Sequence, residues 1–211
     1  MKQYSNQDII NQFIEAKAIL DGHFILSSGL HSDRYIQCAK LLSDPQRSSL
    51  ICSLLAEKIR QNFQPNSFDI ILSPAMGGVV VGYELARQLG LQAIFCERVD
   101  GLFKLRRGFE LLPKQKVLVV EDVITTGKSS LETFKIAQEF GAEVIAEACL
   151  IDRSNDKEIS KKLNVPIISL LNLEIKSFET NQIPPYLESI PPVKPGSRTK
   201  IPDTTSATGT K

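Results

Sequence analysis

Short apolar runs alternate with longer amphipathic stretches along most of the chain. A mostly apolar run that is bounded by turn-forming residues is typical of a buried strand. Runs of this kind predict strands at 23–26, 68–72, 92–96, 117–120, 143–151 and 165–170. The run at 117–120 is continuous rather than alternating, which favours a parallel strand that is covered on both faces.

The amphipathic stretches begin at recognisable helix signals. Ser5 and Asp8 have the spacing of a capping box, and Asp44 is an N-cap residue followed by proline at the first helical position. The pattern predicts helices over 5–20, 45–62, 78–88 and 129–140. Strands that alternate with helices indicate an α/β fold with a mostly parallel central sheet flanked by helices.

The length of 211 residues suits one domain with a full core. The segment from about 1 to 40 is interpreted as a small N-terminal hood, and the core is expected from about 41 to 196. Residues 197–211 are small and polar, so this tail is predicted to be disordered.

Charge and composition exclude several classes of protein. Lys and Arg number 25 against 24 Asp and Glu, so no global field favours nucleic acid or a membrane surface as a partner. No apolar stretch is long enough to span a bilayer. The four cysteines lack paired spacing, and two histidines are too few for a histidine metal site. A cytoplasmic, reducing location is therefore expected.

An acidic pair and a hydroxyl-rich turn follow the strand at 117–120. Glu121 and Asp122 end the apolar run, and residues 125–129 read Thr-Thr-Gly-Lys-Ser before a helix. Unpaired backbone N–H groups at the start of a helix can bind a phosphate. The two carboxylates would repel a phosphate but can accept hydrogen bonds from sugar hydroxyls. The pattern predicts a ribose-5-phosphate site; the alternative is an ordinary strand, turn and helix with a polar surface.

A second turn between a strand and a helix, at residues 73–82, contains adjacent glycines. Gly77 and Gly78 allow the backbone to approach a ligand closely. A sugar that carries both a 5-phosphate and a diphosphate needs two anion-binding turns, so this turn is the candidate diphosphate site. The alternative is a tight turn required only for packing.

Residues 97–110 form a basic segment with glycines at 101 and 108. Its cations are Arg98, Lys104, Arg106 and Arg107. A flap that closes over a diphosphate would have this composition, because it must exclude water and neutralise the charge on the leaving group. A hairpin with a solvated charged face is the alternative.

Two further features could contact a base. Arg153 follows the strand at 143–151, and its guanidinium could bind a carboxylate or the carbonyl edge of a base. Tyr35 and nearby backbone groups of the hood could lie against a planar ring. For each, a purely structural role is equally compatible with the pattern.

The segment 117–130 closely resembles the phosphoribosyl diphosphate (PRPP) signature of the type I phosphoribosyltransferases. Segments 22–29, 73–87 and 97–109 resemble one branch of the orotate phosphoribosyltransferases, and the likeness includes the ending Lys194-Pro-Gly-Ser. The resemblance implies the type I phosphoribosyltransferase fold. It also implies Mg²⁺-dependent transfer of the 5-phosphoribosyl group from PRPP to orotate, giving orotidine 5′-monophosphate and diphosphate in UMP synthesis.

The same resemblance implies roles for individual residues. The expected catalytic residues are Asp122, Glu121, Lys104 and Arg98. The expected PRPP contacts are Glu121, Asp122, Val123, Ile124, Thr125, Thr126, Gly127, Lys128, Ser129, Ala75, Met76, Gly77 and Arg98. The expected orotate contacts are Thr125, Arg153, Tyr35 and Ile36. Mg²⁺ would be bound mainly through PRPP and water rather than by a protein metal site, and each flap would close over the neighbouring site of a homodimer.

The chain departs from the better-known branch of the family at two lysine positions, which are occupied here by Ser27 and Gly77. Its flap also contains fewer lysines and no histidine. Phosphate neutralisation would therefore depend more on backbone amides, Mg²⁺ and the flap arginines. A purine phosphoribosyltransferase and a non-catalytic PRPP-sensing regulator are the alternative functions. The near-zero net charge speaks against a regulator that binds nucleic acid.

Overall fold

The protein is described here by a computed structural model that covers residues 4–26, 28–154 and 159–195. Contacts divide the described residues into a core unit, 4–20 with 35–175, and a hood unit, 21–34 with 176–195. The boundary differs from the expected hood of residues 1–40. The reason is that α1 (Asn6–Glu15) buries Phe13 in the core, and that the chain returns to the hood unit after residue 175. Ser27 and the tail at 197–211 lie outside the described residues.

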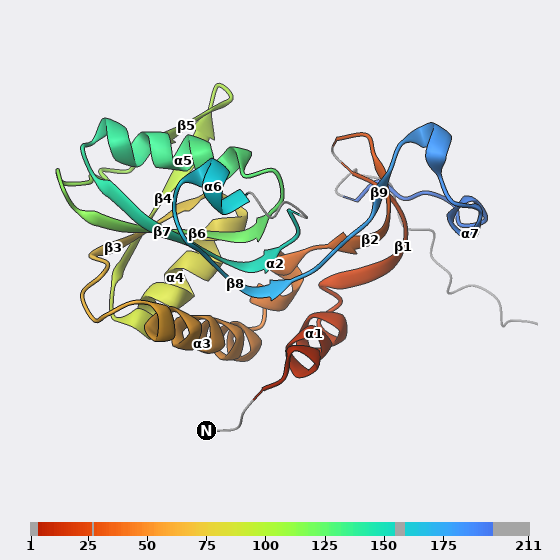
Figure 1. The fold of residues 1–211 in the computed structure, drawn as a ribbon, viewed down its shortest axis with the longest axis horizontal. Coiled ribbons are helices and arrows are strands. Elements are labelled where there is room, and N and C mark those ends of the chain that lie inside the picture. Colours follow the sequence, from red (N-terminus) through yellow and green to blue (C-terminus); the bar gives the residue numbers. More distant parts are fainter. Residues whose placement is uncertain (1–3, 27, 155–158, 196–211) are drawn as a thin grey trace, which may run out of the picture. The chain divides into compact units, whose positions relative to one another are not determined.

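A six-stranded sheet forms the centre of the core unit (Figure 1). Its order is β5-β4-β3-β6-β7-β8, and every neighbouring pair is parallel except β4 and β5. The strands are β3 (Ile70–Pro74), β4 (Gln92–Val99), β5 (Leu102–Leu105), β6 (Lys116–Ile124), β7 (Glu143–Asp152) and β8 (Ile167–Asn172). The predicted α/β fold with a mostly parallel sheet is confirmed.

Helices cover both faces of this sheet (Figure 1). The helices α3 (Pro45–Asn62) and α4 (Gly77–Leu89) lie on one face, together with the short α2 (Cys38–Leu42). The helix α5 (Lys128–Glu139) and the short α6 (Ile159–Leu163) lie on the other. Side chains of β6 alternate between the two hydrophobic clusters, with Leu118 and Val120 in the first and Val117 and Val119 in the second.

The ends of several predicted elements were wrong, among them the strands predicted at 23–26 and 92–96, which are β1 (Ile19–Ile25) and β4. The first helix ends at Glu15 instead of Leu20, because Lys17 adopts a left-handed conformation with φ 53° and β1 then begins at Ile19. The strand predicted at 117–120 continues to Ile124 as β6, still paired with β7, so the acidic pair lies within the strand. The helices predicted at 45–62, 78–88 and 129–140 are confirmed to within one or two residues.

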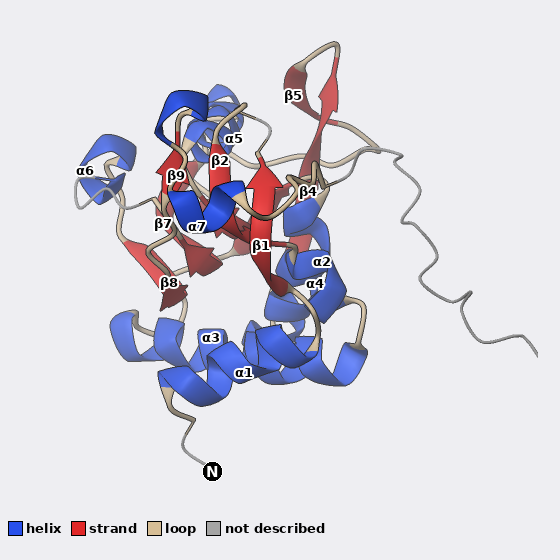
Figure 2. Cartoon of the chain, turned by 90° about the vertical axis from the view of Figure 1, so that its right-hand side faces the viewer, coloured by secondary structure: helices blue, strands red, loops and turns tan. Residues whose placement is uncertain are grey.

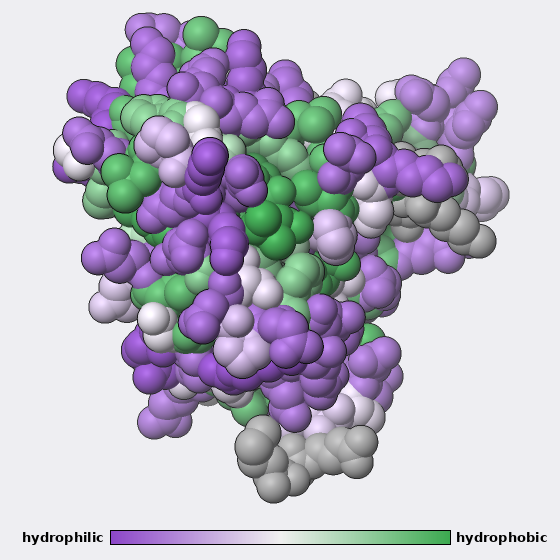
Figure 3. All heavy atoms as spheres, turned by 60° about the vertical axis from the view of Figure 1, so that its left-hand side comes forward, coloured by the Kyte–Doolittle hydropathy of each residue, from purple (hydrophilic) through white to green (hydrophobic). Residues whose placement is uncertain are grey.

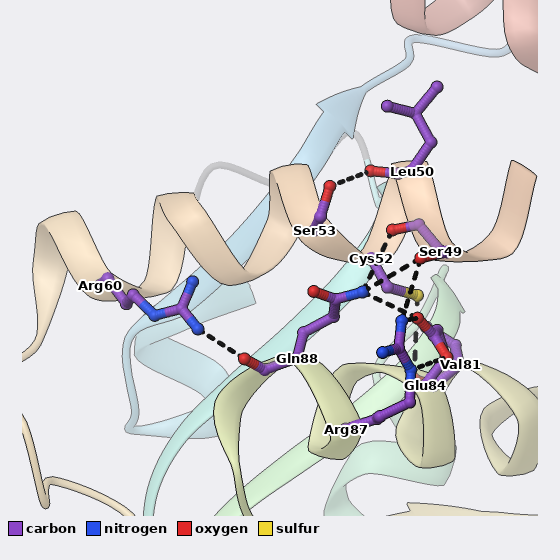
Figure 4. Close-up of polar contacts among 9 residues, drawn as sticks. All are labelled: Ser49, Leu50, Cys52, Ser53, Arg60, Val81, Glu84, Arg87 and Gln88. Atoms are coloured by element: carbon purple, nitrogen blue, oxygen red, sulfur yellow. Dashed lines mark hydrogen bonds and ion pairs between the residues drawn. The ribbon is translucent and has the colours of Figure 1, made fainter. Parts of the chain in front are cut away.

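Polar contacts hold α4 against α3 (Figure 4). Arg87 donates to both carboxylate oxygens of Glu84 at 2.9 and 2.6 Å, and to the hydroxyl of Ser49 on α3 at 3.0 Å. One turn further along, Arg60 of α3 donates to the carbonyl oxygen of Gln88. The contacts fix the C-terminal half of α4, the helix whose first turn is the candidate diphosphate site.

The hood unit contains most of a three-stranded sheet with the order β1-β2-β9. The strands are β1 (Ile19–Ile25), β2 (His31–Ile36) and β9 (Ser177–Phe178), followed by η1 (Thr180–Gln182) and α7 (Pro185–Glu188). His23 and His31 are buried, and their Nε2 and Nδ1 atoms lie 2.6 Å apart. The backbone of Val193 pairs with β1 through His23 and Ile25.

The chain's four cysteines are free and buried. Among the described helices, none has the length and apolar character needed to cross a bilayer.

Candidate active site

The two turns that the sequence singles out meet at the carboxyl edge of the core sheet. Neighbouring parallel strands β3 and β6 both end there, and each leads directly into a helix, α4 or α5. The Gly77 position lies against the carboxyl group of Asp122, because a Cβ added at Gly77 would come 2.6 Å from the Asp122 carboxyl carbon. The predicted diphosphate turn and Asp122, one of the two predicted sugar-binding acids, therefore lie side by side.

The acidic pair of β6 points to opposite faces of the sheet, as successive strand residues do. Asp122 is directed toward the first turn of α4, whereas the Oε1 atom of Glu121 accepts a hydrogen bond of 3.0 Å from Ser130 of α5. Burial raises the pKa of Glu121 to about 7, opposed by the Ser130 hydroxyl and reinforced by the charges of Asp122 and Glu132. Burial also raises the pKa of Asp122.

The turn that precedes α5 is exposed at Thr125, Thr126 and Lys128, as a ligand-binding turn must be. Gly127 has φ 71°, and a Cβ there would lie 2.9 Å from the Cδ1 atom of Ile159. Glycine is therefore required both by the backbone conformation and by the packing of α6. Lys162 of α6 donates to the Thr126 carbonyl oxygen at 2.9 Å, which further fixes the turn.

One predicted PRPP contact is restricted by the fold. The side chain of Ile124 is 1% exposed and packs in the hydrophobic cluster under α5. Its carbonyl oxygen accepts a 3.0 Å hydrogen bond from the backbone N–H of Arg153. A contact of Ile124 with PRPP would be confined to its remaining backbone atoms.

Arg153 follows β7 beside the end of β6. Its guanidinium is partly buried, and burial lowers the pKa of this group. The guanidinium makes no hydrogen bond or ion pair with any other described residue. A partly desolvated cation without a partner gains from binding a carboxylate, so Arg153 is available for an anionic substrate.

The basic segment forms a β4–β5 hairpin that projects beyond the helices of the core unit (Figure 2). Arg98 is engaged with Glu132 of α5 at 2.6 Å, and its guanidinium lies 4.0 Å from the centroid of the Phe103 ring. Arg106 and Arg107 both pair with Glu97. Lys104 is exposed and has no polar partner among the described residues. Of the four cations, Lys104 is thus the one held by no ion pair in this part of the chain.

The predicted base contacts of the hood fall in the core unit. Ile36 is buried with 9% of its surface exposed, and Tyr35 accepts a weak 3.4 Å hydrogen bond from Gln37. Their role toward orotate stays a prediction.

Two polar residues near the site were missed by sequence reasoning, Ser130 and Glu147. Ser130 is 1% exposed and donates a hydrogen bond to Glu121, and Glu147 of β7 is fully buried. The signal was present for Glu147, since a lone acid within the run Ile-Ala-Glu-Ala-Cys-Leu is unusual for a buried strand. No sequence signal indicated the cis peptide bond between Ala75 and Met76.

Comparison with known proteins identifies the family. The phosphoribosyl transferase domain family matches residues 39–183. The orotate phosphoribosyltransferase of Rhizorhabdus wittichii is 48% identical over 197 residues, which cover 93% of this chain and 98% of the relative. That of Caldicellulosiruptor bescii is 50% identical over 191 residues, 90% of this chain and 97% of the relative. The chain belongs to the orotate phosphoribosyltransferase family.

Solved structures agree with this membership. The crystal structure of orotate phosphoribosyltransferase from Aeropyrum pernix has a TM-score of 0.63 at 27% identity, covering 78% of this chain and 93% of that one. Adenine phosphoribosyltransferase from Thermoanaerobacter pseudethanolicus has a TM-score of 0.57 at 20% identity over 66% of this chain and 88% of its own, which shows a shared fold alone. The expected type I phosphoribosyltransferase fold is confirmed.

Proposed function

We propose that this orotate phosphoribosyltransferase transfers the 5-phosphoribosyl group of PRPP to N1 of orotate, giving orotidine 5′-monophosphate and diphosphate in pyrimidine nucleotide synthesis. The observation that carries the proposal is the meeting of Asp122 with the Gly77 turn, in a chain about half identical to curated orotate phosphoribosyltransferases over nearly its whole length. The two strand-end turns can then bind the two phosphate-bearing ends of one sugar.

Each part of PRPP has a matching group in the core unit. Backbone N–H groups and hydroxyls of residues 125–129, at the start of α5, would bind the 5-phosphate. The turn at Ala75–Gly77, before α4, would bind the diphosphate. Asp122, which faces the Gly77 turn, would accept hydrogen bonds from the ribose hydroxyls, with Val123 beside it as a further contact. Glu121 would add a second acceptor only once its side chain leaves Ser130 on the other face of the sheet. Fixing the sugar at both ends would hold C1′ at attack distance from the base.

Orotate would be oriented by groups at the ends of β6 and β7. The guanidinium of Arg153, which has no partner among the described residues, can bind the orotate carboxylate, and the hydroxyl of the exposed Thr125 can bond the ring edge. Tyr35 and Ile36 would contribute contacts to the plane of the base. A carboxylate-binding arginine favours orotate over a purine, which has no carboxylate.

Mg²⁺ is expected to enter with PRPP, held by diphosphate oxygens and water. The chain fits this arrangement, because glycine at position 77 leaves the backbone turn open beside an acidic side chain, where a Cβ would collide. Mg²⁺ commonly takes substrate phosphates and water as ligands and, when bound, would neutralise charge on the departing diphosphate.

The chemistry assigned to the protein is electrostatic. As the bond from C1′ to the diphosphate breaks, positive charge develops at C1′ and negative charge on the leaving group. Lys104, with Arg98 once it leaves Glu132, would stabilise the leaving group, and no covalent nucleophile is required.

We further infer a cytoplasmic homodimer in which the hairpin of each subunit closes over the active site of its neighbour. The exposed apolar side chains of Met76, the N-cap residue of α4, and of Val80 and Tyr83 on the helix have helical spacing and support an association surface.

Most of the molecular face in Figure 3 is hydrophilic, with hydrophobic residues in smaller patches. Such a surface, together with the net charge of +1, supports small molecules and a second copy of the chain as the partners rather than nucleic acid or lipid.

The test is diphosphate release from PRPP and Mg²⁺ with orotate, adenine, hypoxanthine, xanthine or uracil supplied separately. We expect release with orotate alone, accompanied by loss of orotate absorbance. Release with a purine alone would contradict the assignment of the base, and binding of PRPP without diphosphate release for any base would support a sensor.

Asp122→Asn should lower turnover without changing the melting temperature, and unchanged kinetics in that variant would contradict the assigned sugar site.

A further inference from the structure

Glu132 of α5 contacts two cations that the proposed function assigns to the phosphate groups of PRPP. Its Oε2 atom lies 2.6 Å from a guanidinium nitrogen of Arg98, and its Oε1 atom lies 4.0 Å from the Nζ atom of Lys128. Lys128 belongs to the turn at 125–129, and Glu132 follows it by four residues, so the two side chains share one face of α5. A single carboxylate thus binds a cation of the hairpin and a cation of the phosphate turn.

The contact with Arg98 attaches the β4–β5 hairpin to α5. Arg98 also donates to the carbonyl oxygen of Gly101 in the hairpin turn at 2.7 Å, and its guanidinium lies over the ring of Phe103 on the paired strand. One guanidinium therefore connects the hairpin turn, the paired strand and α5. For Arg98 to bind the leaving diphosphate, its guanidinium must first leave Glu132.

The exposure of these side chains makes the ion pairs replaceable by a stronger anion. The side chain of Glu132 is 30% exposed and that of Arg98 is 40% exposed, and Lys128 is more exposed still. Ion pairs at such positions are weak, because water and salt screen them. A phosphate group carries more negative charge than a carboxylate and can bind a guanidinium at two points. PRPP can therefore displace Glu132 from both cations.

We propose that Glu132 is a positioning residue that competes with the substrate for Arg98 and Lys128. It binds both cations before PRPP arrives, yields them to the phosphate groups, and binds them again when diphosphate leaves. The inference rests on the proposed roles of the hairpin and of the turn at 125–129 in binding PRPP. Cations without an internal partner would retain the diphosphate product, so an acid that recaptures them speeds its release. Glu132 would thus weaken the binding of both anions and sustain turnover.

The test compares Glu132→Gln with Glu139→Gln in the full chain, in the presence of Mg²⁺. Gln keeps the size of the side chain and removes its charge. Glu139 is a matched control, because it pairs with Lys135 of α5 at the same four-residue spacing and the same 4.0 Å, at the end of the helix away from the phosphate turn. We expect the KM for PRPP and the calorimetric Kd of diphosphate to fall by about two- to fivefold in Glu132→Gln, the range of an exposed ion pair. The kcat should stay level or fall, and Glu139→Gln should match the wild type.

The direction of the change separates this role from its rivals. A higher KM in Glu132→Gln would mean that Glu132 aims the cations at the phosphates, and an unchanged KM would mean that the ion pairs do not affect binding; either result overturns the proposal. A higher kcat, or an equal fall of KM in Glu139→Gln, would also overturn it, the latter as a general effect of net charge. In an Arg98→Ala background the gain from Glu132→Gln should shrink, and a gain of full size there would overturn the assigned contact.

The foundation is tested separately by Arg98→Ala and Lys128→Ala. If both variants keep the wild-type kcat/KM for PRPP, the assigned phosphate contacts fail. If both are impaired while Glu132→Gln behaves as wild type, only the present inference fails.

Discussion

Gly78 offers a direct test of how closely α4 approaches the sheet. It is buried in the first turn of α4, and a Cβ added there would lie 2.8 Å from the carbonyl oxygen of Val120 and 3.1 Å from the Cβ of Ser73. Val120 belongs to β6, which is hydrogen-bonded to β3 on one side and to β7 on the other. Because that carbonyl oxygen cannot readily yield, Gly78→Ala should displace the helix rather than the strand.

Two opposing effects set the size of the change. Alanine is favoured over glycine inside a helix by up to about 1 kcal/mol. Overpacking of a filled interior costs about 1–3 kcal/mol. The clash outweighs the propensity, because Gly78 lies in the first turn and its closest obstacle is backbone. The expected net loss is about 1 kcal/mol, which lowers the melting temperature by about 2–4 °C in a chain of this size.

Calorimetry at one protein concentration and steady-state kinetics together check this prediction. Displacement of the first turn of α4 should also reduce kcat/KM for PRPP, since the diphosphate turn directly precedes it. Lys135→Ala is the control, because Lys135 is exposed on α5, on the other face of the sheet, and its truncation creates no clash. A Gly78→Ala variant with a higher melting temperature and unchanged kcat/KM would refute the reasoning.

Two further predictions concern pH and the hairpin. The hydrogen bonds from Arg87 hold the pKa of Glu84 below its ordinary value, so Glu84 adds stability above the unfolded pKa of about 4.3 and loses it as the pH falls. The melting temperatures of wild type and Glu84→Gln should therefore differ at neutral pH and converge below about pH 4; a constant gap would be inconsistent with this linkage. Lys104→Ala should lower kcat by about tenfold or more with a smaller change in KM for PRPP, whereas Lys135→Ala, on the exposed side of α5, should change neither. An equal rise in KM would make Lys104 a ground-state contact instead.

The arrangement of the core unit could be predicted from sequence because its signals are local. Each central strand is a short apolar run, and Asp44 with Pro45 marks the start of α3. Parallel strands bring their carboxyl ends to one edge, so the neighbourhood of Gly77 and Asp122 follows once β3 and β6 are recognised. The extension of β6 through Glu121 and Asp122 was missed because acids ordinarily end a buried run, and here the pairing with β7 outweighs that tendency.

The features that could not be predicted depend on contacts between distant segments. The hood unit joins residues 21–34 with 176–195 through β9, which is too short to show a periodic pattern. The ion pair of Arg98 with Glu132 joins residues that are 34 positions apart, and the sequence shows only that both are charged. The end of α1 was missed because Ala16, Lys17 and Ala18 favour helix locally, and packing of the following strand overrides that preference.

The antiparallel strand β5 has a consequence for the behaviour of the protein in solution. It is the outermost strand on its side of the core sheet, so one row of its backbone groups has no partner strand within the sheet. Exposed edges of this kind can recruit strands from other molecules, and a lysine on the edge is a common protection against such aggregation. Lys104 is that lysine, beside a Leu102 that is 65% exposed. Lys104, which is proposed to stabilise the leaving group, would thus also protect the protein against aggregation. A chain with other residues in the β4–β5 hairpin would still need a charged side chain at this edge.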